Sequence, residues 1–203
     1  MFKPRPTSAA REVRMASPYA RTDAWSDWQR PYRLGVVVLL PPGPVRAEID
    51  LLRARYDPRS HAIAPPHISL TVPLQREPDE RLWGELEQVA QDFAPFPIRY
   101  GPLVPFLPKP GAALAIEPQD ELDRIRCALE SCEVFAGAGP RAHPFWAHMT
   151  IAEFVSVEMT QELVRDIGGD RGPSGAFVCD HLSYLVPDEG FRFTERRVIP
   201  FRR

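Results

Sequence analysis

Residues 67–86 read HISLTVPLQREPDERLWGEL, and residues 148–167 read HMTIAEFVSVEMTQELVRDI. The two stretches start 81 positions apart, and each opens with a histidine, an apolar residue, a hydroxyl residue and a second apolar residue. In both copies an alternating pattern gives way to apolar residues at helical spacing, which predicts a strand, a turn and a helix. Such a repeat predicts two lobes related by a rough twofold axis, with the histidine strands meeting at a central cleft.

The segments around the two copies carry a similar mixture of strand and helix patterns. We expect a mixed α/β (α+β) fold with about seven strands and four helices. The expected strands cover residues 34–40, 67–74, 98–107, 112–116, 146–155, 176–186 and 196–201. The expected helices cover residues 44–56, 79–93, 118–131 and 159–167.

Size and charge limit the class of protein. The chain has 203 residues and a formal net charge of −2, so it lacks the overall positive field that holds long nucleic acids. Its three cysteines show no paired spacing, which favours a reducing cytoplasm over a secreted disulfide framework. No apolar run approaches the length of a membrane span. We therefore expect a cytoplasmic protein without a membrane partner, and nothing demands more than a monomer.

The N-terminal segment differs from the rest of the chain. Residues 1–30 contain six arginine or lysine residues and no sustained apolar pattern. We expect them to form a flexible extension, with residues 31–203 as a single bilobed domain. The positive charge of the extension leaves open a contact with a partner or with RNA.

The two histidine motifs have a strand geometry that points to a shared role. Residues i and i+2 of a strand project to the same face, so His67 and Ser69 project together, as do His148 and Thr150. The intervening apolar residues anchor each strand from its other face. Each motif therefore presents one imidazole and one hydroxyl to the predicted cleft.

Two such pairs suit the cleavage of a phosphodiester. The reaction needs a base for the nucleophile and an acid for the leaving oxygen, and histidine titrates near neutrality. The hydroxyls of Ser69 and Thr150 would bind the phosphate and stabilise charge on its oxygens. His143 would point away from His148 on a strand, and no cysteine or carboxylate cluster completes a zinc site. Neither a metal nor another cofactor is expected.

The paired motifs, with the segment AALAIEPQDELDRIRCALE before the second, resemble the 2H phosphoesterases over about residues 34–201. The group they resemble most is that of the 2′-5′ RNA ligases and cyclic phosphodiesterases. The resemblance implies a bilobed fold with two antiparallel-type sheets around the cleft, and His67 and His148 as catalytic residues. It also implies a nucleotide or short RNA substrate with a 2′,3′-cyclic phosphate or a 2′-5′ linkage. Ligation activity of the same kind stays open.

Two positions differ from many members of that family, and they leave the substrate open. Ala147 stands where a proline often precedes the second histidine, and Glu153 stands where RNA-processing members often have a basic residue. The alternative is a non-catalytic module of the same fold that binds a nucleotide or phosphate. Three aromatic residues are candidates for stacking on a base at the rim of the site, with core packing as the other reading: Phe145, Trp146 and Tyr184.

Overall fold

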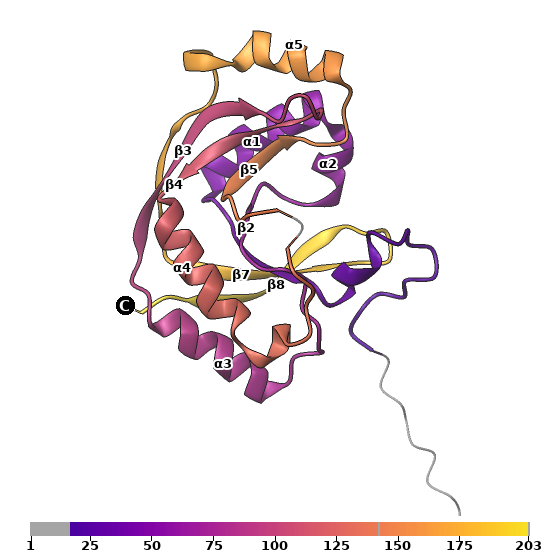
Figure 1. The fold of residues 1–203 in the computed structure, drawn as a ribbon, viewed down its shortest axis with the longest axis vertical. Helices are drawn as coiled ribbons and strands as arrows, with labels where there is room; N and C mark the ends of the chain where they lie inside the picture. Colours follow the sequence, from indigo (N-terminus) through magenta and orange to yellow (C-terminus); the bar gives the residue numbers. More distant parts are fainter. Residues whose placement is uncertain (1–16, 142, 203) are drawn as a thin grey trace, which may run out of the picture.

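A computed structural model describes residues 17–141 and 143–202. In this part of the chain eight strands form one curled sheet in the order β6-β3-β4-β5-β2-β1-β7-β8, and each neighbouring pair is antiparallel (Figure 1). The α+β class is confirmed, but the expectation of two separate sheets is not met, because β2 and β5 join the two halves. The strands are β1 Val36–Leu39, β2 Ile68–Ser69, β3 Phe96–Pro105, β4 Ala112–Glu117, β5 His148–Ala152, β6 Gly175–Cys179, β7 His181–Pro187 and β8 Phe193–Pro200.

Five α-helices and three short 3-10 helices connect the strands in the described residues. The helices are α1 Gly43–Tyr56, α2 Pro58–Ile63, α3 Glu80–Gln91, α4 Gln119–Glu130 and α5 Val157–Ile167, with 3-10 helices Arg30–Leu34, Glu133–Phe135 and Gly169–Arg171. The helices after the two motifs start in the same way. The side chain of Asp79 caps α3 by accepting from the amide of Leu82, and Ser156 caps α5 by accepting from Met159.

The duplication expected from the sequence is visible in the topology. β1, α1, β2 and α3 follow one another in the first half as β4, α4, β5 and α5 do in the second. In the sheet, β2 and β5 lie side by side at the centre, flanked by β1 and β4. Figure 1 shows α3 and α4 at one end of the molecule and α5 at the other. The repeat therefore places the two histidine strands next to each other.

The main core lies on the helix-covered face of the sheet. Its members from the two motifs are Ile68, Leu70, Met149 and Ile151, all with no exposed surface. They pack with the apolar faces of the helices, so burial fixes which way each motif faces. The histidines and hydroxyls must then lie on the opposite face.

Several element boundaries differ from those expected. β2 has two residues rather than eight. The hydroxyl of Thr71 accepts the hydrogen bond of the Val37 amide in place of a backbone carbonyl, and Pro73 has no amide to donate to a neighbouring strand. The strand expected over residues 176–186 is broken at Asp180 into β6 and β7, which lie at different places in the sheet. α2 was not expected, because six residues are too few to show helical periodicity.

Part of the expected N-terminal extension packs on the domain. Residues 1–16 lie outside the described residues, so flexibility there stays a prediction. Trp25 is buried, its Nε1 donates to the carbonyl of Glu189 at 2.9 Å, and its ring lies edge-on to Phe191 with centroids 5.0 Å apart. Residues 17–30 therefore cover the turn between β7 and β8. No helix in the described ranges is long and apolar enough to cross a membrane.

Candidate functional site

The two motifs meet across one pair of antiparallel strands. Ile68 of β2 is paired with Met149 of β5. This register places His67 across from Thr150 and Ser69 across from His148. Each imidazole therefore neighbours the hydroxyl of the other motif, a register that the repeat alone does not predict.

Both imidazoles are oriented by the backbone just before them. Nδ1 of His67 lies 2.8 Å from the carbonyl oxygen of Pro65, and Nδ1 of His148 lies 2.7 Å from that of Trp146. A carbonyl oxygen only accepts, so Nδ1 carries the proton in both rings. Nε2 is then the atom that gains or loses a proton, and it is free to face a ligand.

Both histidines favour the neutral state in the unliganded protein. Burial lowers the pKa of His67 to about 4, against the raising effect of the bond to Pro65, and the positive charges of Arg53 and His148 lower it further. Burial also lowers the pKa of His148, while the bond to Trp146 raises it. The effect of the His148 ring on the pKa of His67 fits their placement at one site.

Two alanines and two hydroxyl groups lie on the same face of the sheet as the two rings. Ala113 and Ala115 of β4 are paired with Thr150 and His148, so their methyl groups lie on the same face of the sheet as these two side chains. Ser69 is exposed and Thr150 is half-buried. Within the described residues neither hydroxyl makes a protein hydrogen bond, so both can donate to a ligand.

The structure explains why alanine rather than proline precedes the second histidine, at position 147. The amide of Ala147 donates to Oε1 of Gln119 at 2.9 Å, and its carbonyl accepts from Nε2 of Gln119 at 2.8 Å. A proline at position 147 would lack that amide. The Gln119 amide thus fixes the backbone before His148, as Pro66 restricts it before His67. Sequence reasoning missed Gln119, because only the folded chain brings it to Ala147.

A buried polar cluster lies beside the first histidine. Asp57 accepts from the amides of Glu153 and Phe154 through Oδ2, at 2.7 and 2.9 Å, and from that of Ser60 through Oδ1 at 3.0 Å. Burial alone would raise its pKa, but these amides bring it below the ordinary value. Arg53 is also buried, donates to the carbonyl of Ser60 at 2.7 Å, and has an Nε without a partner in the described residues.

Glu153 is therefore surrounded by charge rather than isolated. Burial and the neighbouring Asp57 raise its pKa, while Arg53 and Arg59 act in the opposite direction. The acid at position 153, where the resemblance leads us to expect a basic residue, thus has two arginines nearby. One of them, Arg53, also influences the pKa of His67.

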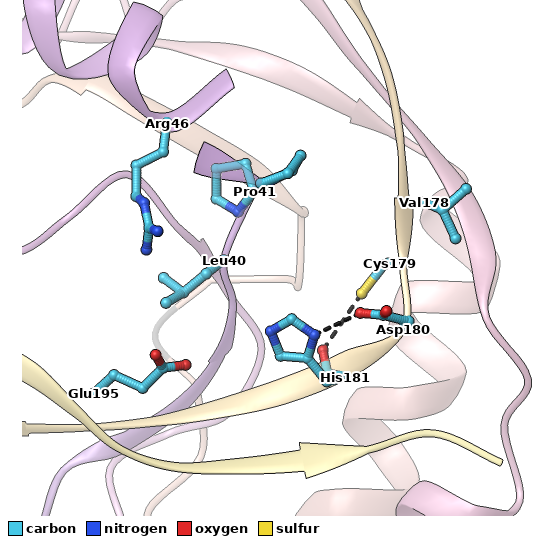
Figure 2. A pocket seen from close by; sticks show the side chains of 9 residues that line it. Leu40, Pro41, Arg46, Val178, Cys179, Asp180, His181 and Glu195 are labelled. Atoms are coloured by element: carbon cyan, nitrogen blue, oxygen red, sulfur yellow. Dashed lines mark hydrogen bonds and ion pairs between the residues drawn. The ribbon is translucent and has the colours of Figure 1, made fainter. Parts of the chain in front are cut away.

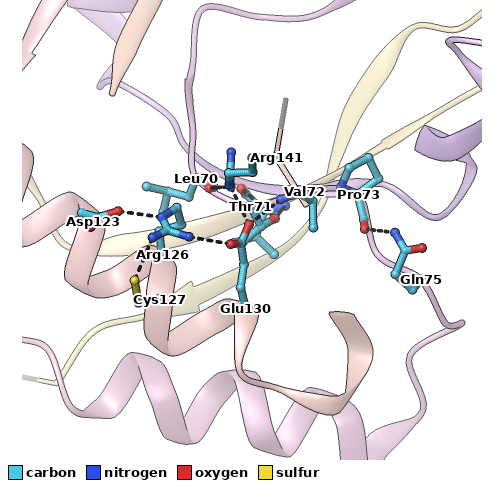
Figure 3. Close-up of polar contacts among 11 residues, drawn as sticks. Leu70, Thr71, Val72, Pro73, Gln75, Asp123, Arg126, Cys127, Glu130 and Arg141 are labelled. Carbon is cyan, nitrogen blue, oxygen red and sulfur yellow. Dashed lines mark hydrogen bonds and ion pairs between the residues drawn. The ribbon is translucent and has the colours of Figure 1, made fainter. Parts of the chain in front are cut away.

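A second charged network braces the end of the first motif. Figure 3 shows Arg141 and Arg126 converging on Glu130. Arg141 also donates to the carbonyl of Leu70 at 2.6 Å, and Glu130 accepts from the amide of Val72 at 2.9 Å. Residues far apart in the sequence therefore hold the backbone that follows His67. A cavity of about 380 Å³ lies against this network.

The aromatic side chains near the second motif separate into two groups. The ring of Trp146 stacks on His148 at 4.8 Å and is 36% exposed, and Phe106 lies edge-on to both rings. Phe145 packs between Arg126 and Arg141 and against the core. Trp146 is therefore placed to meet a ligand at His148, whereas Phe145 serves packing.

Tyr184 does not lie at the site. It is paired with Val37 on the helix-covered face, is buried, donates to the carbonyl of Leu34 at 2.6 Å and lies edge-on to Trp83. This placement argues against the rim position expected for it.

Another cavity, of about 320 Å³, lies away from both motifs. Figure 2 shows Arg46, His181 and Glu195 among the side chains that line it, and His181 bonded to Asp180. Neither His67 nor His148 lines it. In residues 17–141 and 143–202 no group of three or more His, Cys, Asp or Glu side chains is arranged to hold a metal ion.

Sequence comparison identifies one family and several relatives. Residues 41–191 match the 2′-5′ RNA ligase superfamily. A protein of Geobacillus kaustophilus named "Putative phosphoesterase" is 32% identical over 104 residues, which cover 50% of this chain and 59% of the relative. A protein of Oceanobacillus iheyensis with the same description is 26% identical over 120 residues, covering 58% of this chain and 68% of the relative. The chain thus matches about three-fifths of the length of the first relative.

Solved structures share the fold at low sequence identity. The crystal structure of E. coli LigT with 3′-AMP has a TM-score of 0.53 and 16% identity, covering 83% of this chain and 97% of LigT. A Thermus thermophilus protein has a TM-score of 0.51 and 15% identity, covering 82% of this chain and 97% of its own. At such identity these matches establish the architecture alone.

Proposed function

Because the chain belongs to the 2′-5′ RNA ligase superfamily, we propose that it is a phosphoesterase that cleaves nucleotide phosphodiesters with two histidines and no metal ion. The observation that carries the proposal is the pairing of Ile68 with Met149, which sets each imidazole beside the hydroxyl of the other motif. One phosphate between the strands would meet two imidazoles and two hydroxyls.

We assign the two histidines different roles from their pKa values. His67 has the more strongly lowered pKa, so its Nε2 is unprotonated near neutral pH and serves as the general base. The pKa of His148 is shifted less, so His148 takes up a proton first when the negative charge of a phosphate arrives. Its Nε2–H then serves as the general acid.

For a 2′,3′-cyclic phosphate the reaction begins with water beside His67. Nε2 of His67 takes a proton from the water while the water oxygen forms a bond to phosphorus. The bond from phosphorus to one ribose oxygen breaks, and Nε2–H of His148 protonates that oxygen. Ser69 and Thr150 donate to the phosphoryl oxygens, whose charge grows during the reaction. The product is a phosphate monoester on the other ribose oxygen.

The substrate class proposed is a 2′,3′-cyclic phosphate or a 2′-5′ linkage of a nucleotide or short RNA. Solved structures of LigT contain 3′-AMP and NADP⁺, which supports a nucleotide ligand for this fold. The formal charge of −2 on this chain favours a short ligand over a long nucleic acid.

The test is hydrolysis of 2′,3′-cyclic nucleotides and 2′-5′ dinucleotides by wild type, His67→Asn and His148→Asn. Asparagine keeps a donor near the position of Nδ1 but has no Nε2, so it isolates the proton transfer. We expect kcat/KM to fall about 10²- to 10⁴-fold in each variant, with wild-type activity resistant to chelators. Product mass and phosphate position identify the bond that is cleaved.

His61→Asn is the matched control, because His61 is exposed and paired with Asp50. It should keep wild-type activity. Near-normal turnover in both of the other variants would rule out the mechanism. Nucleotide binding by the wild type without any turnover would favour the binding module instead.

A further inference from the structure

A partly exposed aromatic surface lies outside the two motifs. It consists of Trp28, Phe154 and Arg59, here called the Trp28 platform. Trp28 is 45% exposed, and its ring centroid lies 5.9 Å from that of Phe154. The guanidinium of Arg59 lies over the Phe154 ring at 4.0 Å. Two flat groups and one cation are therefore presented together.

The platform is rigidly held. Trp28 rests edge-on against the buried ring of Phe191, with centroids 5.2 Å apart. The amide of Phe154 donates to Asp57, the same carboxylate that caps α2 and so orients the helix that carries Arg59. These contacts order three segments that are distant in sequence, so the exposed ring of Trp28 is preorganised.

The platform is also close to the proposed reaction centre. Phe154 follows Thr150 by four residues, which an extended chain spans in at most about 13 Å. Glu153 lies between them in the sequence, and the charges of Arg53 and Arg59 act against the burial that raises its pKa. Arg53 also lowers the pKa of His67. Neighbouring nucleotides of a short RNA can cover that distance.

We propose that the Trp28 platform binds the base of a nucleotide that flanks the scissile phosphate, so that the preferred substrate is an oligonucleotide rather than a mononucleotide. This rests on the proposed function. Every base has a flat face that stacks on an indole ring, and an arginine beside it contributes cation–π attraction and pairs with backbone phosphate. In the described residues the guanidinium of Arg59 has no ion pair, so it is available for a phosphate.

The platform extends beyond the segment that matches the family model. Trp28 precedes residues 41–191, the segment that matches the superfamily. Trp146, stacked on His148, offers a second exposed ring at the other motif. An oligonucleotide bound across the site would therefore contact the indole of Trp146 at His148 and the indole of Trp28 beyond Thr150.

The experiment compares kcat/KM for 2′,3′-cyclic AMP with that for the trinucleotide ApApA ending in a 2′,3′-cyclic phosphate. The wild type should prefer the trinucleotide, and Trp28→Ala should lower that preference about tenfold. Trp28→Phe, which keeps a flat ring, should restore most of it. Leu51→Ala is the control, because Leu51 is 74% exposed and lies on α1. Circular dichroism verifies that each variant is folded.

The two proposals can fail separately. An unchanged preference in Trp28→Ala, or a wild type without any preference, would overturn the inference while leaving the proposed function intact. If the wild type cleaves neither substrate, the proposed function fails, and the inference is decided by calorimetry with ApApA carrying a 3′-phosphate. Weaker binding by Trp28→Ala than by Leu51→Ala would then support the platform, and equal binding would refute it.

Discussion

His67 and His148 are oriented by backbone carbonyls two residues before them, at 2.8 and 2.7 Å, rather than by a carboxylate. A neutral carbonyl fixes the tautomer without adding the negative charge that would raise the pKa of the ring. Burial then dominates and keeps both rings neutral. A bound phosphate would supply the missing negative charge, so protonation of the site is coupled to occupancy.

The lowered pKa of His67 predicts a loss of stability in acid. Burial chiefly lowers it from 6.5 to about 4. Between these values the unfolded chain binds a proton that the folded protein does not. The contribution of the neutral His67 ring to the free energy of unfolding is therefore complete above pH 6.5, and it is lost as the pH falls towards 4. At about 1.4 kcal/mol per pKa unit, the loss is on the order of 3 kcal/mol.

Urea unfolding between about pH 4 and 7 measures this effect. His67→Asn should show a flatter dependence of the unfolding free energy on pH than the wild type, and His61→Asn should not. If His67→Asn keeps the full acid dependence of the wild type, the account of His67 is wrong.

At the scale of elements, the motif strands are short and depend on their neighbours. β2 has only two residues, and the Arg141 contact to Leu70 holds the backbone just after it, while Asp57 holds the backbone just after β5. Asp57 joins α2 to the end of β5 through three backbone amides. One carboxylate thus links the element before the first histidine to the strand of the second.

Removing the Asp57 carboxylate should therefore be costly. Asp57→Ala leaves three amides without their acceptor, and we expect a loss on the order of 3 kcal/mol in the free energy of unfolding. Denaturant unfolding measures it, with Asp23→Ala as the control, because the Asp23 carboxylate is 80% exposed and pairs only with Arg21 in the described residues. A loss no larger than that of the control would contradict the bracing role.

The sequence predicts the elements that local periodicity governs. α3 and most of α5 follow from apolar spacing, and the repeat predicts that the two histidine strands meet. Contacts between distant residues are not encoded in any local pattern. Gln119 with Ala147, and Arg141 with Leu70, are 28 and 71 positions apart, so the groups that brace the motifs appear only in the folded chain.

The described part of the molecule is built on one continuous sheet, and the proposed site lies at the junction of its halves. Two sheets were expected from the family resemblance, and the repeat does not reveal that β2 and β5 hydrogen-bond to each other. That pairing fixes the register of the motifs. A single phosphate would then contact both halves of the molecule at once, so that its binding depends on the correct pairing of the two halves.

The most direct measurement follows both imidazoles by NMR while phosphate is added. Long-range ¹H–¹⁵N spectra, assigned with His67→Asn and His148→Asn, report the protonation of each Nε2 across the pH range. We predict Nδ1–H tautomers in the free protein and a rise in the pKa of both histidines at one shared phosphate concentration. Phosphate that shifts only one ring, or neither, would contradict the claim that His67 and His148 act on the same anion.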